Sequence, residues 1–340
     1  MTGHTGFKGG WLCIWLKSLG AEVVGFSKVP AEQPCLFEEA NISGGMTSLI
    51  GDIKDLSSLS AAIRSHRPEI IFHMAAQPLV RNSYIDPVET YATNVMGTVN
   101  LLESARQVDS VKVIVNITTD KCYENKEWYW GYRETEPMGG YDPYSSSKGC
   151  SELVTNAYRN SFLRTAKISV ASARAGNVIG GGDWAADRLV PDAFRALQNN
   201  QSFLVRNPNA IRPWQHVLEP LSGYLLLAQK MYGSSNQYSQ AWNFGPGDND
   251  AKTVDWIASY ICEVWGEGAS WVTDDGDHPH EANYLKLDIS KARSDLGWQP
   301  RWTLSDSLTR IVRWHKSWQE GICAEKLCLK EINDFYRLTE

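Results

Sequence analysis

The sequence contains seven cysteines among its 340 residues, but no C-x-x-C pair and no cysteine spacing typical of a zinc site. An odd, scattered set predicts reduced thiols in a cytoplasmic protein and excludes a disulfide framework. No run of eighteen apolar residues is present, and the apolar stretch at 11–16 is too short for a membrane span. Internal repeats and low-complexity linkers are also absent. These features predict a globular cytoplasmic protein.

An excess of basic charge is absent as well. The chain carries 33 Lys and Arg against 39 Asp and Glu, a net charge of -6. This balance gives no electrostatic footprint for nucleic acid or for an anionic membrane, and we expect neither partner. Two histidines stand together in His278-Pro279-His280, but two histidines in a polar loop do not define a metal site. We therefore predict no metal.

Short apolar stretches that alternate with helical patterns indicate the fold class. Strands are expected at 22–26, 69–74, 111–117 and 168–173, and helices at 11–19, 56–63 and 88–108. This alternation predicts an α/β fold, a Rossmann-like doubly wound parallel sheet with right-handed crossovers. The alternation of strand and helix patterns becomes less regular after Asn177. We expect a nucleotide-binding domain at 1–176 and a smaller substrate-binding lobe at 177–340, with about 211–245 returning to the first domain.

A glycine-rich loop opens the chain. Gly3, Gly6 and Gly9 have the spacing of a dinucleotide-binding turn, and the backbone amides from Phe7 onward would face a pyrophosphate. Such a loop normally follows a central strand, and here only Met1 precedes Thr2. We expect that strand to be missing from the sequence, its neighbours to be left with unpaired backbone, and dinucleotide binding to be weak.

The acidic residue that usually follows the second strand and binds the adenosine ribose is also absent. Ser27-Lys28 stands in its place, and by charge alone Lys28 would favour a 2′-phosphate. Asp52, followed by Ile53, is placed to reach the adenine. The residues leave the choice between NAD and NADP open.

A tyrosine and a lysine four residues apart indicate a catalytic site. Tyr144 and Lys148 share one face of a predicted helix, where the ammonium would lower the pKa of the phenol and make it a usable base. A surface pair would have the same spacing. However, Thr118-Thr119-Asp120-Lys121 ends a predicted strand nearby in sequence, and ligands of such sheets bind beyond the carboxyl ends of the strands.

Taken together, the motifs resemble those of the extended short-chain dehydrogenase/reductases that act on nucleotide sugars. They are Gly3-His4-Thr5-Gly6-Phe7-Lys8-Gly9, Ala75-Ala76-Gln77, Asn94, Thr118-Thr119-Asp120, Tyr144-x-x-x-Lys148, Arg174-Ala175-Gly176-Asn177 and Leu296-Gly297-Trp298. Within that family, Thr119-Asp120-Lys121 and Ile211-Arg212-Pro213-Trp214-Gln215-His216 are similar to the branch that dehydrates CDP-glucose. The resemblance implies NAD as cofactor and CDP-glucose as substrate. It also places Ala75, Ala76, Gln77, Asn94 and Thr118 at the cofactor.

The resemblance further implies a role for each catalytic residue. Tyr144 would take the proton of the sugar O4, Thr119 would hydrogen-bond O4, and Lys148 would hold the nicotinamide ribose. Asp120, kept protonated, would give its proton to the departing O6 hydroxyl. Lys121 stands where the thymidine-sugar dehydratases carry a glutamate as the C5 base, and it could serve only with a depressed pKa.

The resemblance also implies substrate contacts and an assembly. Asn177, Arg188 and Arg212 would lie near the diphosphate or nucleotide, because guanidinium suits phosphate oxygens. The helices near 88–108 and 144–160 are similar to the family's dimer bundle, so a homodimer is expected. Two other functions stay open: a nucleotide-sugar 4-epimerase, which would not need Asp120 and Lys121 as an acid/base pair, and a non-catalytic NAD-binding scaffold. Fold alone does not separate them.

Overall fold

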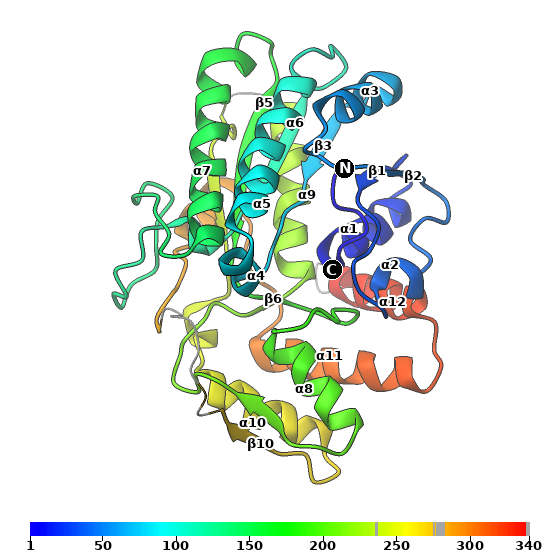
Figure 1. Ribbon diagram of the computed structural model, residues 1–340, viewed down its shortest axis with the longest axis vertical. Helices are drawn as coiled ribbons and strands as arrows, with labels where there is room; N and C mark the ends of the chain where they lie inside the picture. The colour runs from blue at the N-terminus through cyan, green and yellow to red at the C-terminus, as the bar shows by residue number, and fades with distance from the viewer. Residues whose placement is uncertain (235–236, 275, 277–282, 338–340) are drawn as a thin grey trace.

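A parallel sheet forms the centre of the molecule, with strand order β2-β1, then the single residue Thr2, then β3-β4-β5-β9 (Figure 1). The computed structural model describes residues 1–234, 237–274, 276 and 283–337. The strands of this sheet are β1 (Val24–Ser27), β2 (Thr47–Ile50), β3 (Ile70–His73), β4 (Val113–Ile117), β5 (Ser169–Ala175) and β9 (Ala241–Phe244). All their described pairings are parallel, and the Rossmann-like fold is confirmed.

Thr2 occupies the position of a central strand between β1 and β3. It forms parallel bridges to Phe26 and to His73. Its amide donates to the Phe72 carbonyl at 3.0 Å, and the Gly3 amide donates to the Phe26 carbonyl at 3.0 Å. Among the described residues, the strand expected before the glycine loop is therefore represented only by Met1, Thr2 and Gly3.

Helices cover both faces of the sheet, and β4 shows how its side chains divide between them. Val113, Val115 and Ile117 pack with α1 (Phe7–Ser18), α9 and α12. Ile114 points to the opposite face and packs with α3 and α6. The two layers are thus α1, α9 (Leu218–Gly233) and α12 (Ala324–Arg337) on one face and α3 (Leu56–His66), α6 (Gly97–Ala105) and α7 (Pro143–Tyr158) on the other. Burial on both faces explains the continuous apolar run of this strand.

The helical pattern expected at 88–108 is a chain of shorter elements. α5 (Pro87–Tyr91) continues through one π-helical turn (Ala92–Met96) into α6. α4 (Val80–Ile85) and α7 (Pro143–Tyr158) lie beside α5, and a second π-helical turn at Arg159–Leu163 follows α7. Figure 1 shows the continuous run of α5 and α6 with α7 alongside it, on one side of the molecule.

The second lobe lies beyond the carboxyl ends of the strands and has its own apolar core. Its main elements are α8 (Leu189–Gln198), α10 (Val254–Trp265), α11 (Leu304–Gln319) and the parallel pairs β6 (Val178–Ile179) with β8 (Gln215–His216) and β7 (Phe203–Val205) with β10 (Trp271–Thr273). The short elements are α2 (Leu36–Glu39), the 3-10 turns Asp120–Cys122 and Asp248–Asp250, and the π-helical turn Ala292–Leu296. Chain segments cross back to the first domain, since β9 pairs with β5 and α12 packs on α1.

In the part of the chain that the structure describes, no helix is long and apolar enough to cross a bilayer. All seven cysteines, which fall within that part, are free thiols.

Candidate active site

The glycine loop brings backbone closer to backbone than any side chain permits. Gly3 has φ +77°, and a Cβ there would lie 2.7 Å from the Ala75 nitrogen. A Cβ on Gly9 would lie 2.0 Å from the Gly3 carbonyl oxygen. α1 begins directly behind this turn, with no side chain capping its first amides. The loop therefore leaves free amide groups at the start of a twelve-residue helix, the arrangement that binds phosphate in this class of fold.

A cavity of about 680 Å³ extends from this loop to the second lobe. Most of the site residues expected from the sequence line it. They are Gly3, Gly6, Phe7, Gly9, Asp52, Ile53, Ala75, Ala76, Thr118, Thr119, Asp120, Lys121, Tyr144, Lys148, Asn177, Arg188 and Arg212. The cavity therefore joins the expected cofactor, catalytic and substrate positions in one continuous space.

Gln77 and Asn94 do not line this cavity but lie behind its wall. The Gln77 amide donates to the Asn94 side-chain oxygen at 2.8 Å, and the Asn94 side-chain nitrogen donates to the Gln77 carbonyl at 3.1 Å. Asn94 also donates to the Ser147 hydroxyl at 2.9 Å. These bonds tie the backbone of the loop after β3 to Asn94 and, through Ser147, to α7. The assignment of Gln77 and Asn94 to the cofactor stays a prediction.

Tyr144 stands in the first turn of α7 at the carboxyl end of β4. Asp142 caps this helix by accepting a hydrogen bond from the Ser145 amide at 2.9 Å, and Pro143 takes the first helical position. The Lys148 ammonium, one turn later, donates to the Ile117 carbonyl at 3.3 Å. The pair thus projects from one helix face into the cavity, as its spacing predicts.

The pKa of Tyr144 moves in the opposite direction from the one its spacing suggested. Burial raises the pKa of Tyr144 to about 12, although a hydrogen bond with Thr119 works to lower it. Burial also lowers the pKa of Lys148 to about 8, against the pull of the Glu152 carboxylate. Removal from water is thus the largest influence on the pKa of Tyr144, and the lowering of that pKa by Lys148 stays a prediction.

Asp120 is buried beside this pair. Its Oδ1 accepts a hydrogen bond from the Thr119 hydroxyl at 2.9 Å. Its Oδ2 is buried with no hydrogen-bond partner among the described residues. Burial raises the pKa of Asp120, while the charges of Lys121 and Arg212 work in the other direction. The raised pKa agrees with a carboxyl group that keeps its proton, as a general acid requires.

A buried ion pair between Glu152 and Arg174 lies next to the catalytic residues. Glu152 lies one turn after Lys148 and accepts hydrogen bonds from the Thr118 hydroxyl at 2.5 Å, the Ser172 hydroxyl at 2.6 Å and the Arg174 guanidinium at 2.7 Å. Burial pushes the pKa of Glu152 upward, but Arg174 and these hydrogen bonds hold it below its ordinary value. The network joins the end of β4 to α7 and β5.

Three basic residues that line the cavity, Lys8, Arg81 and Arg206, were not singled out from the sequence. The Lys8 ammonium lies 3.5 Å from the Tyr224 hydroxyl, and burial together with Lys148 and Arg188 lowers the pKa of Lys8 to about 7. Arg81 and Arg206 both approach the Asp187 carboxylate, at 3.3 Å and 3.7 Å. Lys8 stood inside the glycine motif and could have been noticed there, whereas no local pattern joins the other residues.

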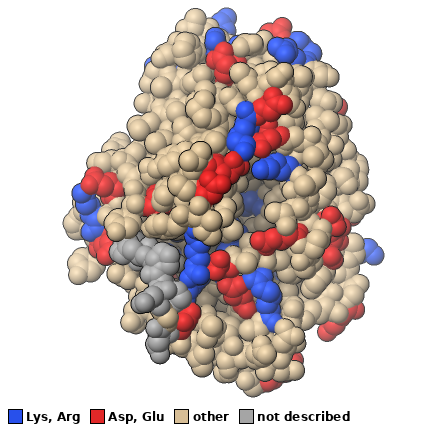
Figure 2. Space-filling model, viewed as in Figure 1, with Lys and Arg blue, Asp and Glu red and all other residues tan. Residues whose placement is uncertain are grey.

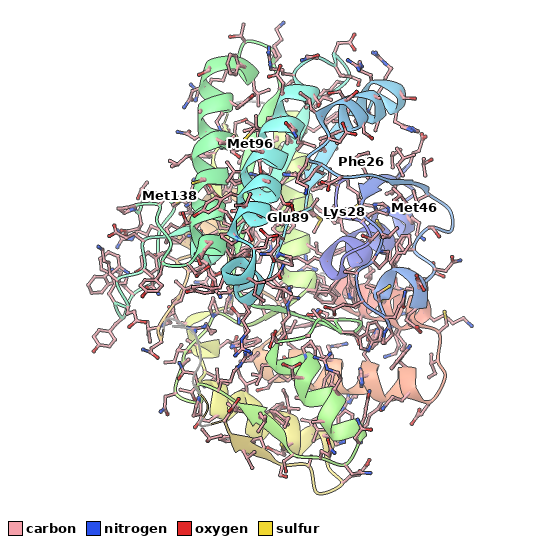
Figure 3. The ribbon with its side chains drawn as sticks, in the orientation of Figure 1. Phe26, Lys28, Met46, Glu89, Met96 and Met138 are labelled. Atoms are coloured by element: carbon pink, nitrogen blue, oxygen red, sulfur yellow. The ribbon has the colours of Figure 1, made fainter. Side chains whose placement is uncertain are left out.

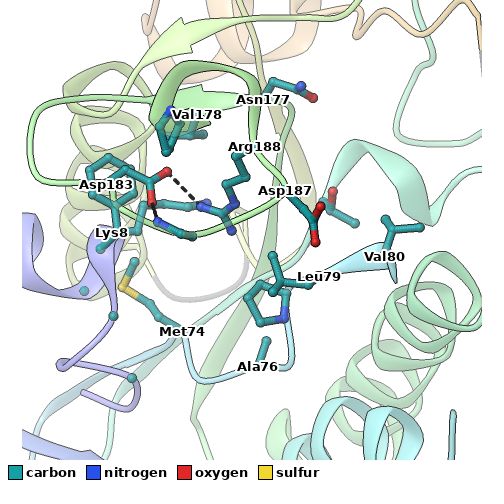
Figure 4. Close-up of a pocket in the computed structure, with 18 of the residues that line it drawn as sticks. Lys8, Met74, Ala76, Leu79, Val80, Asn177, Val178, Asp183, Asp187 and Arg188 are labelled. Carbon is teal, nitrogen blue, oxygen red and sulfur yellow. Dashed lines mark hydrogen bonds and ion pairs between the residues drawn. The ribbon is translucent and has the colours of Figure 1, made fainter. Parts of the chain in front are cut away.

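The expected substrate residues lie on the second-lobe side of the cavity. Arg188 donates to the Asp183 carboxylate at 2.9 Å, and Figure 4 shows this pair beside Lys8 and facing Met74 across the cavity. Arg212 is buried and Asn177 is half-buried, both on the cavity wall. His278 and His280 lie outside the described residues. Among the residues that the structure describes, no group of three possible metal ligands was found.

The family model described as GDP-mannose 4,6 dehydratase matches residues 1–311. The chain belongs to this family. One curated relative is the CDP-glucose 4,6-dehydratase of Salmonella typhimurium strain LT2. It is 57% identical to this chain over 348 aligned residues, which cover 100% of this chain and 96% of the relative. The membership confirms the resemblance that the sequence motifs indicated.

Solved structures of related enzymes share the fold. The UDP-glucose 4-epimerase of Thermotoga maritima, solved with UDP-glucose, has a TM-score of 0.80 and 22% identity and covers 94% of this chain and 98% of its own. The dTDP-glucose 4,6-dehydratase of Bacillus anthracis, solved with NAD, has a TM-score of 0.78 and 21% identity over 94% of this chain and 96% of its own. At these identities the likeness establishes the fold alone.

Proposed function

We propose that this chain catalyses the NAD-dependent dehydration of CDP-glucose to CDP-4-dehydro-6-deoxyglucose. The observation that carries the proposal is the single cavity that joins the glycine turn to Tyr144, Thr119 and Asp120. The 57% identity to a CDP-glucose 4,6-dehydratase over the full chain supports this substrate. Residues 1–176 would hold the dinucleotide, and most of 177–340 would hold the nucleotide sugar.

The residues present fit a dinucleotide. Gly3 and Gly9 let the loop backbone pack closely against Ala75 and against itself, and this tight turn presents the first amides of α1 to the cavity. Asp52 and Ile53 would face the adenine, and Lys148 would hold the nicotinamide ribose. When bound, NAD⁺ supplies the hydride acceptor for oxidation at C4 and the hydride donor for the later reduction at C6.

The chain's own residues move the protons. Tyr144 removes the proton of the C4 hydroxyl while Thr119 hydrogen-bonds the same oxygen. The resulting C4 ketone acidifies the hydrogen on C5, and Lys121 removes it as a proton. Asp120 donates its proton to the C6 hydroxyl, which leaves as water and produces a C5–C6 double bond. After reduction at C6 and return of a proton to C5, the cofactor is unchanged overall.

A turnover assay tests this proposal. With CDP-glucose and NAD⁺, the purified protein should form a 4-keto-6-deoxy sugar and release water, with no net accumulation of NADH. Proton NMR of the product would show a C6 methyl group. A product epimerised at C4, or an oxidised sugar formed together with stoichiometric NADH, would contradict the dehydratase assignment. Cofactor binding without turnover would support the scaffold alternative.

The epimerase alternative rests on the fold it shares with the Thermotoga maritima enzyme. An epimerase needs the Tyr144 and Lys148 pair and a returning hydride, but it has no leaving hydroxyl to protonate. Asp120, buried with a raised pKa next to Thr119, has a role in the dehydration and none in the epimerisation. This residue therefore favours the dehydratase.

Lys121 is the proposed base at C5. We expect Lys121→Met to block exchange of the C5 hydrogen with solvent while oxidation at C4 continues, because only the C5 proton transfer needs an amine at this position. Deuterium incorporation from heavy water into the sugar, followed by mass spectrometry, measures the exchange.

The control for that experiment is Lys126→Met, since Lys126 is exposed and is not among the residues that line the cavity. This variant should exchange at the rate of the unaltered protein. Exchange at the native rate in Lys121→Met would assign the C5 base to another group.

Asp120→Asn should instead permit oxidation at C4 and exchange of the C5 hydrogen but stall before loss of water.

We also propose that the chain acts as a homodimer in the cytoplasm. Apolar side chains on the outer faces of α4, α5, the first π-helical turn and α7 are exposed, among them Ile85 (81%), Val88 (77%), Met96 (50%) and Leu153 (60%). Figure 3 shows Met96 on this side of the molecule. Such a surface suits burial against a second copy. The free thiols suit a reducing compartment.

A further inference from the structure

Lys28, which left the cofactor choice open in the sequence, lies in a charged cluster at the edge of the cavity. Its ammonium is 3.6 Å from the Asp52 carboxylate and 3.7 Å from the Glu89 carboxylate. Lys28 follows β1, Asp52 follows β2, and Glu89 belongs to α5, so three separate elements meet here. Figure 3 shows Lys28 and Glu89 approaching each other, and Figure 2 shows acidic and basic side chains gathered beside a hollow on this face.

Lys54 completes the group, which we call the rim cluster: Lys28, Asp52, Lys54 and Glu89. The Lys54 ammonium lies 2.5 Å from Glu89 and 3.5 Å from Asp52. The two carboxylates thus each contact both lysines, and the four charges sum to zero. Lys28 and Asp52 line the cavity, whereas Lys54 and Glu89 are not among the lining residues.

Further hydrogen bonds fix the two carboxylates. The Lys54 amide donates to Asp52 at 2.9 Å, and the Thr93 hydroxyl donates to Glu89 at 3.2 Å. Lys28 itself has a side chain that is 63% exposed, so its pairs are weakened by solvent, but both carboxylates also have contacts that do not involve Lys28. A dianionic group that approached Lys28 would therefore meet both carboxylates.

We propose that the rim cluster selects NAD over NADP, with Asp52 and Glu89 neutralising the lysine that would otherwise attract a 2′-phosphate. The inference rests on the proposed cofactor role of the cavity, whose glycine turn and Asp52 lie on the same side as Lys28. An acidic residue at the end of β1 is the usual means of excluding the 2′-phosphate. In this chain the negative charge comes from β2 and α5, and the residue at the end of β1 is a lysine.

The test compares dissociation constants for NAD⁺ and NADP⁺ by isothermal titration calorimetry at low salt. The unaltered protein should bind NAD⁺ about tenfold or more tightly than NADP⁺. Glu89→Gln leaves the cluster with a net positive charge, and it should tighten NADP⁺ binding about fivefold to tenfold with a much smaller change for NAD⁺. The gain should shrink as salt is added, because the charges are partly exposed.

Two further variants keep the test specific. Glu22→Gln makes the same change of charge at an exposed site outside the cluster and should leave both dissociation constants unchanged. Lys28→Met combined with Glu89→Gln should lose the NADP⁺ gain. Equal binding of both dinucleotides by the unaltered protein, or no NADP⁺ gain in Glu89→Gln, would overturn the inference while leaving the NAD role intact. Failure to bind either dinucleotide would overturn the cofactor assignment itself and the inference with it.

Discussion

Tyr144→Phe is expected to reduce the rate of C4 oxidation by about a hundredfold or more, because the substitution removes the group that takes the O4 proton. Phenylalanine keeps the aromatic ring in the first turn of α7 beside Thr119, so the variant should fold like the unaltered protein. Single-turnover formation of NADH, followed by its absorbance after mixing with CDP-glucose, measures the step directly. Dissociation constants for NAD⁺ and the nucleotide sugar should change little by comparison.

The pKa of Tyr144 adds a pH dependence to this expectation. Burial raises that pKa to about 12, so the fraction of phenolate in the protein alone rises with pH throughout the neutral range. Oxidation by the unaltered protein should therefore accelerate as pH increases. The Tyr144→Phe variant should lack that dependence.

A nearby tyrosine provides the control. Tyr141 lies three residues before Tyr144 but is 81% exposed. Tyr141→Phe should oxidise the substrate at the native rate with the native pH dependence. A Tyr144→Phe variant that matched it would show that another group takes the O4 proton.

Local patterns predicted the parts of the molecule that one segment determines. Four of the six described strands of the sheet were recognisable, because buried strands have apolar side chains toward both faces, as Val113 and Ile114 show in β4, whereas β2 and β9 are not among these four. The Tyr144 and Lys148 pair was recognisable because helical spacing alone puts both on one face. The glycine loop was recognisable because Gly3 and Gly9 have no room for a Cβ.

Contacts between distant segments were beyond such patterns. Nothing near Arg81 in the sequence indicates that it meets Asp187, and nothing near Lys28 indicates Glu89. The depth at which Tyr144 is buried, which raises its pKa, was also beyond the sequence, because spacing reveals the ammonium neighbour but not the removal from water. The sequence likewise does not indicate that the Gln77 backbone amide donates to the Asn94 side chain.

Glu152→Gln should destabilise the fold by about 3–5 kcal/mol, since it leaves the Arg174 charge buried without its counter-ion. Both side chains are almost completely buried, with 4% and 5% exposed, and their ion pair is 2.7 Å long. Thermal denaturation of the purified protein would measure the loss as a lower Tm. Thr118 also loses its carboxylate acceptor, so the carboxyl end of β4 should become less ordered.

Glu103→Gln is the matched control, because Glu103 pairs with Arg106 on the exposed surface of α6. Exposed pairs of this kind are worth about 0.3–0.5 kcal/mol, so its Tm should hardly change. The pH dependence gives a second check. The pKa of Glu152 is lowered in the folded state, so its stabilising contribution is present above its ordinary pKa and is lost as pH falls through the folded value. Protonation then removes the same charge as the substitution, and the Tm difference between Glu152→Gln and the unaltered protein should narrow in acid.

Equal Tm values for Glu152→Gln and Glu103→Gln at neutral pH would show that this network does not support the fold beneath the catalytic residues.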